Sequence, residues 1–261
     1  MIRRPPRSTL SSSSAASDVY KRQLLCSAII SIIAIQLRSI QENNVVLDMQ
    51  KKIVSSAGLT TVYGSVENAM SNIKTMIIDL DKGEIVDISP DSYELAKELR
   101  EEGKYKFLSA ENDIASIKKR EKFSKVYIEY KDDKINTLIL PVRGYGLWGI
   151  LYGYLAIEGD FNTVAGLEFY EHKETPGLGA EIDNPKWKAL WKGKKIYQED
   201  GQVSLKVIKG SVLENSDDFV YEVDGLSGAT LTCNGVTNLI AYWMGSDGFL
   251  NFINNLKEID V

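Results

Sequence analysis

The chain has 261 residues, 44% hydrophobic and 26% charged, which is ordinary for a globular protein and excludes disordered, collagen-like and coiled-coil chains. Its net charge is −5, but residues 1–23 hold five Lys or Arg and one Asp, a charge of +4, so residues 24–261 carry −9. Residues 24–261 are too acidic to present the basic face that phosphate backbones require, and we expect no nucleic-acid partner. Two cysteines and one histidine are too few for a disulfide framework, a Cys/His zinc site or a di-histidine metal centre, so no metal site is expected.

The first 23 residues differ in character from the rest of the chain. They combine two prolines, a run of four serines and scattered basic residues, with no apolar period of 2 or 3.6. Such a segment cannot bury a face. We therefore expect residues 1–23 to be a non-native leader of vector, adapter or misassembled sequence.

An uncharged apolar segment follows at Leu24–Leu37, and three interpretations compete for it. As a helix, its 14 residues span about 21 Å, against about 30 Å for a bilayer core. A signal peptide would need a small-x-small cleavage site after Leu37, which is absent, and a buried core helix is the second alternative. Because the helical pattern continues through Val45 to Val54, we favour a truncated transmembrane helix and stalk over residues 24–58, with membrane lipid as a partner and one domain over residues 59–261.

The domain begins with a predicted hairpin and helix. Two β-type runs, Thr75–Leu80 and Glu84–Ile88, flank an Asp-Lys-Gly turn. Asp91 and Glu94 then resemble a capping box, which predicts a helix over Ser92–Glu102.

The middle of the domain is a block of strands. Runs of β-branched and aromatic residues between Gly, Asp and Asn turns predict a mostly antiparallel sheet. The predicted strands are Lys125–Tyr130, Ile135–Val142, Ile150–Glu158 and Val164–Tyr170.

Helices dominate the C-terminal part. Asn184 before Pro185 is typical of a helix start, and Val203–Ile208 predicts another strand. Apolar residues at helical spacing predict a helix over Leu231–Met244 and a shorter one near Gly248–Leu256. Strands in a block with flanking helices predict an α+β fold.

The segment Gly144–Gly149 satisfies the pattern G-x-G-x-x-G. The strand-like run Ile150–Leu155 follows it, so no helix N-terminus is placed to hold a pyrophosphate. We therefore expect no Rossmann site but a tight turn beside Tyr145 and Trp148.

Ser227 is a candidate nucleophile, but it lies in GLSGA, where the hydrolase pattern G-x-S-x-G requires a second glycine. A Ser/His/Asp triad would also have to use His172, the only histidine. We expect His172 to be a loop residue held by hydrogen bonds, and we assign no catalytic residue.

Two loops have the composition of ligand-binding turns. In Glu174–Gly179, Pro and two Gly restrict the backbone so that amides can face a ligand, although a plain connection is favoured from this segment alone. In Asp224–Thr230, small residues and two hydroxyls directly precede a helix. Either Thr230 carries an esterified phosphate at the positive end of the helix, or Ser227 or Thr230 is a simple N-cap.

Four stretches, in this order and spacing, carry a resemblance to a known family. They are LRSIQENNVVLD, PVRGYGLWGILYG, EFYEHKETPGLGAEIDNPKWKALWKGK and VDGLSGATLTCNGVTNLIAYWMG. From Leu24 to its end, the chain resembles the C subunit of the Na⁺-translocating NADH:quinone reductase, a membrane protein that carries FMN. The resemblance implies FMN attached covalently through a phosphoester to Thr230, with Asp224 required by the flavin transferase.

The resemblance also implies the rest of the flavin site and the role of the protein. The implied role is an electron relay without substrate turnover of its own, in the bacterial inner membrane, with one span and the C-terminal domain on the periplasmic side. Implied partners are the other subunits of the complex and the flavin transferase during maturation. The implied flavin contacts are Glu174, Thr175, Leu178, Gly179, Lys206, Ser227, Gly228 and Ala229, with Leu147 and Trp148 closing the pocket.

Two alternatives remain. The homologous G subunit of the ferredoxin:NAD⁺ electron-transport complex shares the anchor and the flavinylation pattern. If the Ser-Gly-Ala-Thr stretch is only a helix cap, the chain is a flavin-free extracytoplasmic binding module. Cys233 stands where we expect Ser, a near-isosteric change without an implied redox role.

Overall fold

The computed structural model describes residues 10–213 and 215–259, and the chain divides into two units, Met1–Asp48 and Met49–Val261. Helix α1 (Leu10–Ser56) begins inside the segment 1–23, which we expected to be a non-native leader; the first nine residues of that segment lie outside the described part. Residues 10–23 contain neither Pro nor Gly, so nothing interrupts the helix that continues into the apolar run. Residues Ala16–Ser56 are long and apolar enough to cross a membrane, by length and composition.

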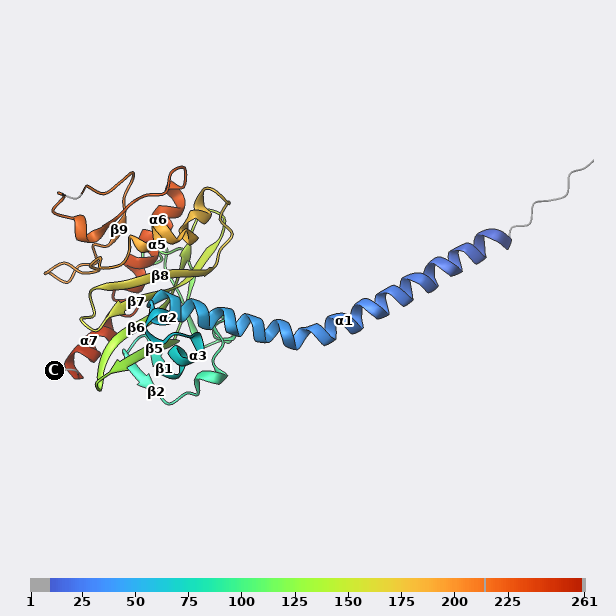
Figure 1. The fold of residues 1–261 in the computed structure, drawn as a ribbon, viewed down its shortest axis with the longest axis horizontal. Helices are drawn as coiled ribbons and strands as arrows, with labels where there is room; N and C mark the ends of the chain where they lie inside the picture. Colours follow the sequence, from blue (N-terminus) through green and yellow to red (C-terminus); the bar gives the residue numbers. More distant parts are fainter. Residues whose placement is uncertain (1–9, 214, 260–261) are drawn as a thin grey trace, which may run out of the picture. The chain divides into compact units, whose positions relative to one another are not determined.

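The second unit is built on an antiparallel sheet of six strands, in the order β2-β1-β5-β6-β7-β8 (Figure 1). The predicted hairpin and the four predicted central strands are confirmed, each within a few residues of the expected ends. The strands are β1 (Ile73–Asp79), β2 (Glu84–Val86), β5 (Phe123–Lys131), β6 (Lys134–Tyr145), β7 (Ile150–Glu158) and β8 (Val164–Glu171).

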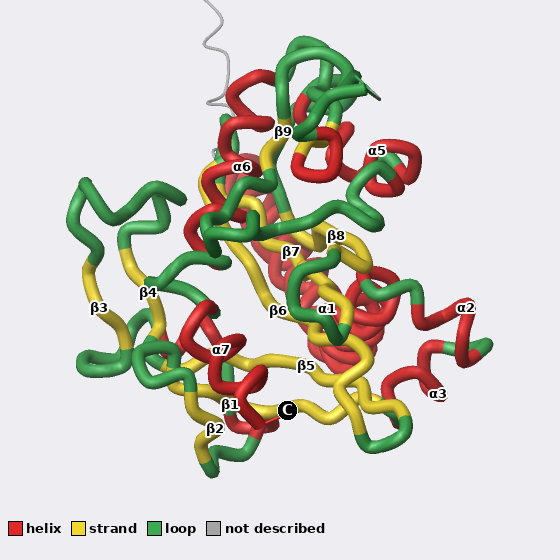
Figure 2. The backbone as a smooth tube through the Cα atoms, turned by 90° about the vertical axis from the view of Figure 1, so that its left-hand side faces the viewer, coloured by secondary structure: helices red, strands yellow, loops and turns green. Residues whose placement is uncertain are grey.

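Each face of this sheet buries a different set of helices (Figure 2). On one face, α6 (Thr230–Trp243) and α7 (Leu250–Ile259) pack against the sheet residues of the larger apolar core. On the other, the last residues of α1 lie with α2 (Leu59–Tyr63) and α3 (Val66–Ser71). The sheet is therefore covered on both faces, which explains its runs of consecutive buried residues.

The helix predicted over Ser92–Glu102 is wrong. The chain forms a 3₁₀ turn, η1 (Pro90–Ser92), and a single helical turn, α4 (Leu95–Glu98), without a side-chain cap. Between them Tyr93 has extended backbone, and its hydroxyl donates to the Phe123 carbonyl at 3.1 Å. Turning the Tyr93 ring toward the sheet removes Glu94 from the position that a capping box requires.

The C-terminal helices follow the prediction more closely than the strand between them. Asn184 caps α5 (Pro185–Ala189), accepting a hydrogen bond from Lys186 N at 3.0 Å. The strand predicted over Val203–Ile208 shortens to β9 (Lys206–Val207), because Ser204 N bonds to Ile196 O and interrupts the ladder. Besides α2 and α3, the short elements that the sequence did not predict are β3 (Tyr105–Phe107), β4 (Lys119–Glu121), η2 (Gly179–Asp183), η3 (Phe219–Tyr221) and β10 (Glu222–Val223), which pairs parallel with β9.

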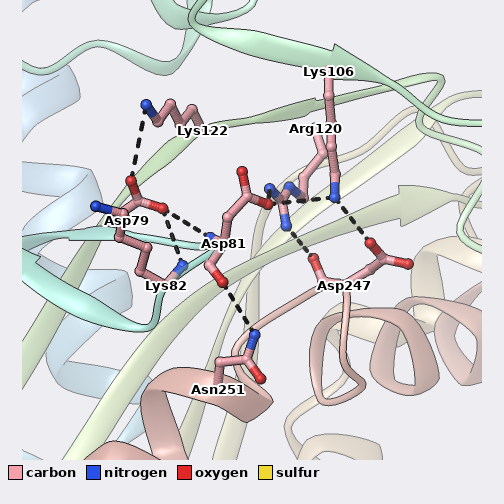
Figure 3. A network of polar contacts seen from close by, with 8 residues as sticks. All are labelled: Asp79, Asp81, Lys82, Lys106, Arg120, Lys122, Asp247 and Asn251. Atoms are coloured by element: carbon pink, nitrogen blue, oxygen red, sulfur yellow. Dashed lines mark hydrogen bonds and ion pairs between the residues drawn. The ribbon is translucent and has the colours of Figure 1, made fainter.

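A polar network joins the β1–β2 turn, the β3–β4 ribbon and the α6–α7 linker (Figure 3). The buried Arg120 guanidinium pairs with Asp81 and donates to the Asp247 carbonyl at 2.7 Å. Lys106 Nζ lies 3.0 Å from Asp247 Oδ1 and 3.4 Å from Asp81 Oδ1. Burial alone would raise the pKa of Asp81, but Arg120 and Lys106 hold it below the usual value.

The β7–β8 turn depends on the carboxylate of Asp160. It accepts from Asn162 N at 2.9 Å and Thr163 N at 2.7 Å, from the Thr163 hydroxyl, and from Lys195 Nζ at 3.0 Å. Burial opposes ionisation, but these donors outweigh it and lower the pKa of Asp160 to about 2, from 3.8.

Asp160 should therefore contribute stability that depends on acid pH. Because its folded pKa is depressed, its contribution is complete above pH 3.8 and is lost as the pH falls to about 2. The side chain is about half exposed, so we expect only about 1 kcal/mol. Urea unfolding of wild type and Asp160→Asn should differ by this amount at pH 5 and converge near pH 2; a constant difference would contradict the assignment.

Candidate functional site

A cavity of about 420 Å³, within the range of small-molecule sites, opens at the first turn of α6. One wall is the loop that precedes α6, and the other is the segment that follows β9. The cavity is lined by Val207, Ile208, Lys209, Gly210, Ser211, Gly225, Leu226, Ser227, Gly228, Thr230, Cys233 and Asn234.

The loop before α6 is a tight turn that ends without a side-chain cap. Leu226 O accepts from Ala229 N at 3.1 Å, and Gly228 supplies a φ of +73° at the third position, as a type II turn requires. Ala229 occupies the N-cap position, so the expectation that Ser227 or Thr230 caps the helix is wrong. The first helical bond runs from Cys233 N to Ala229 O, so the amides of Thr230 and the next two residues precede it and face the helix end.

Asp224 supports this loop from outside the cavity. Its carboxylate accepts from Val212 N at 2.8 Å, and its carbonyl accepts from Trp187 Nε1 at 2.8 Å. One residue later, Gly225 N donates to Gly210 O at 2.8 Å. Asp224 therefore holds the two walls of the cavity together, a role that needs no contact with a ligand.

Glu174 links three segments around the same helix end. Its Oε1 accepts from Leu147 N at 2.9 Å and Trp148 N at 3.0 Å, in the β6–β7 turn. Its Oε2 accepts from Thr232 Oγ1 at 2.5 Å, two residues beyond Thr230. The side chain is buried, so its carboxylate acts as an internal clasp, which we call the Glu174 clasp.

The motif Gly144–Gly149 forms the predicted tight turn, closed by a bond from Gly146 N to Gly149 O at 2.8 Å. A Cβ on Gly146 would lie 2.6 Å from Glu174 Oε1, whereas one on Gly149 would meet only the flexible Lys173 side chain, at 3.3 Å. Gly146 is therefore required by the Glu174 clasp.

We expect Gly146→Ala to lower the free energy of unfolding by about 1–3 kcal/mol, because the new methyl displaces a buried carboxylate. The matched variant Gly149→Ala, in the same turn, should stay within about 0.5 kcal/mol of wild type. Urea denaturation checks both. Equal losses in the two variants would mean that the turn, and not the clasp, sets the requirement.

Large apolar side chains stand exposed around this helix end. Trp148 is 61% and Leu231 58% exposed, and Leu147 and Leu178 are also exposed. Leu178 lies against the loop before α6, since a Cβ on Gly228 would be 2.9 Å from its Cδ2. The predicted contacts at 147–148, 174–179 and 227–230 thus come together in space, although their contact with a ligand stays a prediction. Thr175 belongs to the same loop, where its carbonyl accepts from Leu178 N and Ala180 N.

Lys206 does not line the cavity. Its Nζ lies 3.3 Å from Glu222 Oε1 and 3.9 Å from Asp218 Oδ2, beside a separate smaller pocket. The lysine on the cavity wall is Lys209, three residues later and exposed. The sequence pattern did not predict that Lys209 lines the cavity. Strand β9 is shorter than the predicted strand, and this changes which residues form the cavity wall.

His172 is held by hydrogen bonds, as expected: Nε2 lies 2.8 Å from Asp183 Oδ2, and Nδ1 accepts from Glu174 N at 3.2 Å. Neither bond involves Ser227, so the geometry gives no support to a hydrolase triad.

Comparison with known proteins places this site in a family. The FMN-binding domain family matches residues 146–245, which include the β6–β7 turn, the Glu174 loop and all of α6. The chain is 47% identical to the C subunit of the Na(+)-translocating NADH-quinone reductase of Pseudomonas aeruginosa, covering 90% of this chain and 92% of that protein. The chain belongs to this C-subunit family. The corresponding protein of Vibrio anguillarum is 40% identical, over 92% of this chain and 93% of that protein.

Solved structures of the C-subunit family have the same fold. A crystal structure of Shewanella oneidensis NqrC superposes with a TM-score of 0.72 at 32% identity, covering 80% of this chain and 96% of that one. The C subunit from Parabacteroides distasonis gives a TM-score of 0.60 at 28% identity, covering 83% and 96%. The predicted family and the predicted α+β fold are thereby confirmed. The Pseudomonas and Vibrio relatives are both C subunits, which favours this family over the G-subunit alternative.

Proposed function

We propose that this chain is an electron-relay subunit of a Na⁺-translocating NADH:quinone reductase, carrying FMN covalently on Thr230. One observation carries the proposal: Thr230 is exposed in the first turn of an uncapped 14-residue helix and lines a cavity of ligand size. Membership of the C-subunit family and the FMN-binding domain match support the cofactor class.

The phosphate end of FMN fits the helix start. A phosphodiester on Thr230 Oγ1 would lie at the positive end of the helix, beside backbone amides that no side chain caps. Lys209, on the cavity wall, supplies a cation to the same anion. Gly228 has no side chain, so it leaves the approach of the phosphate to Thr230 open.

The ring end fits the exposed apolar side chains. Leu178 offers apolar surface against the loop that carries Thr230, and the exposed Leu147 and Trp148 belong to the turn that the Glu174 clasp joins to α6. An isoalloxazine ring on these side chains would bury surface that is otherwise in water, which favours binding by about 25 cal/mol per Å². We propose that Leu147 and Trp148 close the pocket, with Thr175 and Gly179 in the loop beside it.

The bound flavin supplies one- and two-electron redox chemistry, and the chain supplies its binding and surroundings. Covalent attachment prevents loss of the cofactor from an extracytoplasmic domain. The Glu174 clasp holds the β6–β7 turn against α6, so that Trp148 keeps a defined position relative to Thr230. The Asp224 carboxylate keeps the second wall of the cavity in place.

The apolar helix within α1 supports attachment to a membrane. We propose the bacterial inner membrane, with one span, residues 24–58 as anchor and stalk, and the domain that follows on the periplasmic side. The proposed partners are the other subunits of the reductase, membrane lipid, and a flavin transferase that recognises the stretch from Asp224 to Thr230 during maturation.

Intact mass spectrometry tests the proposal. The full chain, expressed together with a flavin transferase, should gain the mass of one FMN less one water and fluoresce in a denaturing gel. Expression without the transferase is the control and should give the bare mass. A bare mass in both samples would favour the flavin-free binding module.

A further inference from the structure

His172 is the only histidine of the chain, and its two ring nitrogens make different contacts. Nδ1 accepts the backbone N–H of Glu174 at 3.2 Å, so Nδ1 carries no proton in this arrangement. Nε2 therefore carries the proton and donates it to Asp183 Oδ2 at 2.8 Å. This assignment follows from the hydrogen-bond network, as a carboxylate partner sets the tautomer of a histidine in many sites.

The backbone that His172 holds belongs to the Glu174 clasp. The Glu174 amide is bound to the imidazole, and the Glu174 carboxylate is bound to the amides of Leu147 and Trp148 and to the Thr232 hydroxyl. The carboxylate has little freedom to adjust, because Gly146 and Gly179 lie against its two oxygens without room for a Cβ. A shift of the Glu174 backbone therefore moves the β6–β7 turn relative to the start of α6.

We propose that His172, oriented by Asp183, is a positioning residue that sets the Glu174 clasp and through it the position of Trp148 relative to the first turn of α6. The inference rests on the proposed function, since it takes the site next to Thr230 as the flavin site. His172 touches no reacting atom and acts only through Glu174.

The arrangement depends on the neutral imidazole. Protonation of Nδ1 turns the acceptor into a donor that faces the Glu174 N–H, so the bond between them is lost. The charged group that contacts the ring is the Asp183 carboxylate, whose Oδ2 lies 2.8 Å from Nε2. At acid pH the bond between the imidazole and the Glu174 amide is therefore lost, while the contact between Nε2 and Asp183 remains.

Two substitutions test the roles of the two ring nitrogens one at a time. The side-chain oxygen of His172→Asn stands near Nδ1 and can still accept the Glu174 N–H, whereas the amide nitrogen of His172→Gln stands near Nε2 and can still donate to Asp183. The measurement is the backbone amide resonance of Trp148 in the full chain, labelled with ¹⁵N-tryptophan and assigned with Trp148→Phe. A second sample, labelled with ¹⁵N-histidine, reports the tautomer through the two ring ¹⁵N shifts of the single histidine.

We expect the Nε2–H tautomer at neutral pH and a Trp148 amide shift that changes between neutral and acid pH together with the ring ¹⁵N shifts of His172. His172→Asn should keep the neutral-pH shift at every pH, His172→Gln should show the acid shift at every pH, and both should lose the pH dependence. In flavin-loaded protein, the pH profile of flavin emission should flatten in both variants. The opposite tautomer, or a Trp148 amide that ignores both substitutions, overturns the proposal.

The same spectra on Thr230→Val separate this inference from the proposed function. Positioning by His172 is a property of the protein alone, so the tautomer and the Trp148 shift should persist without flavin. If Thr230 carries no flavin in any sample, the proposed function fails while this result stands. If flavin loads normally but the Trp148 amide does not respond to the His172 substitutions, only the positioning role fails.

Discussion

Thr230→Val should abolish covalent flavin completely, giving a chain of bare mass without in-gel fluorescence after expression with the flavin transferase. Valine has nearly the same shape as threonine but lacks the hydroxyl on which the phosphodiester would form. Thr230 is exposed, and its side chain makes no cap to α6, so the fold should be unaffected. The thermal unfolding midpoint should therefore stay within about 2 °C of the wild-type value.

Ser211→Ala is the matched control, because it removes another exposed hydroxyl from the wall of the same cavity, outside the stretch from Asp224 to Thr230. It should keep the FMN mass, since the proposed transferase recognition stretch is unchanged. Persistent fluorescence in Thr230→Val, or its loss only in Ser211→Ala, would move the attachment site and contradict the assignment.

Arg143→Met should destabilise the domain more than Gly146→Ala or Asp160→Asn. Arg143 and Glu121 are both buried, with Nη2 and Oε2 only 2.5 Å apart, and Arg143 also donates to the Lys119 carbonyl at 2.9 Å. Methionine leaves the Glu121 carboxylate buried without its cation. Breaking a buried pair from one side costs about 3–5 kcal/mol, which urea denaturation of the full chain should show.

A double variant distinguishes lost charge pairing from lost packing. In Glu121→Leu/Arg143→Met both charges are absent, so the desolvation penalty on Glu121 disappears and the double variant should be more stable than Arg143→Met alone. Trp243, whose ring lies 5.3 Å from the guanidinium and whose Nε1 donates to the Arg143 carbonyl at 2.6 Å, can still pack on the methionine. A double variant as unstable as the single one would show that shape, and not charge, dominates at this position.

Local patterns were sufficient for most elements of the fold. Alternating and β-branched runs predicted the central strands, and Asn184 with Pro185 predicted a cap that the structure contains. The prediction failed where a distant contact overrides a local one. The Tyr93 hydroxyl bonds to a carbonyl 30 residues away, and that contact removes the helix that Asp91 and Glu94 suggest.

The candidate site also has residues that local sequence patterns predict and residues that they do not. Small residues and a helix start are neighbours in the chain around Thr230, which left a phosphate site and a simple helix cap both open, and the resemblance to the family decided for the flavin site. Lys209 was not recognisable, since its place on the cavity wall depends on where the short strand β9 ends and on the bond between Gly225 N and Gly210 O. The clasp was equally hidden: Glu174 and Thr232 are 58 residues apart, and no local pattern links them.

The sequence by itself determined the acidic charge of residues 24–261, the apolar segment before the domain, the central strands and the C-terminal helices, and the Asp224–Thr230 stretch that marks the flavin family. These depend on periodicity, composition and contiguous residues, which are properties of the chain before it folds. Only the tertiary structure decided that Glu174 serves as a clasp, that Lys209 rather than Lys206 lines the cavity, and that Ala229 leaves the helix uncapped. Those outcomes depend on which distant backbone and side-chain atoms packing brings within hydrogen-bond distance.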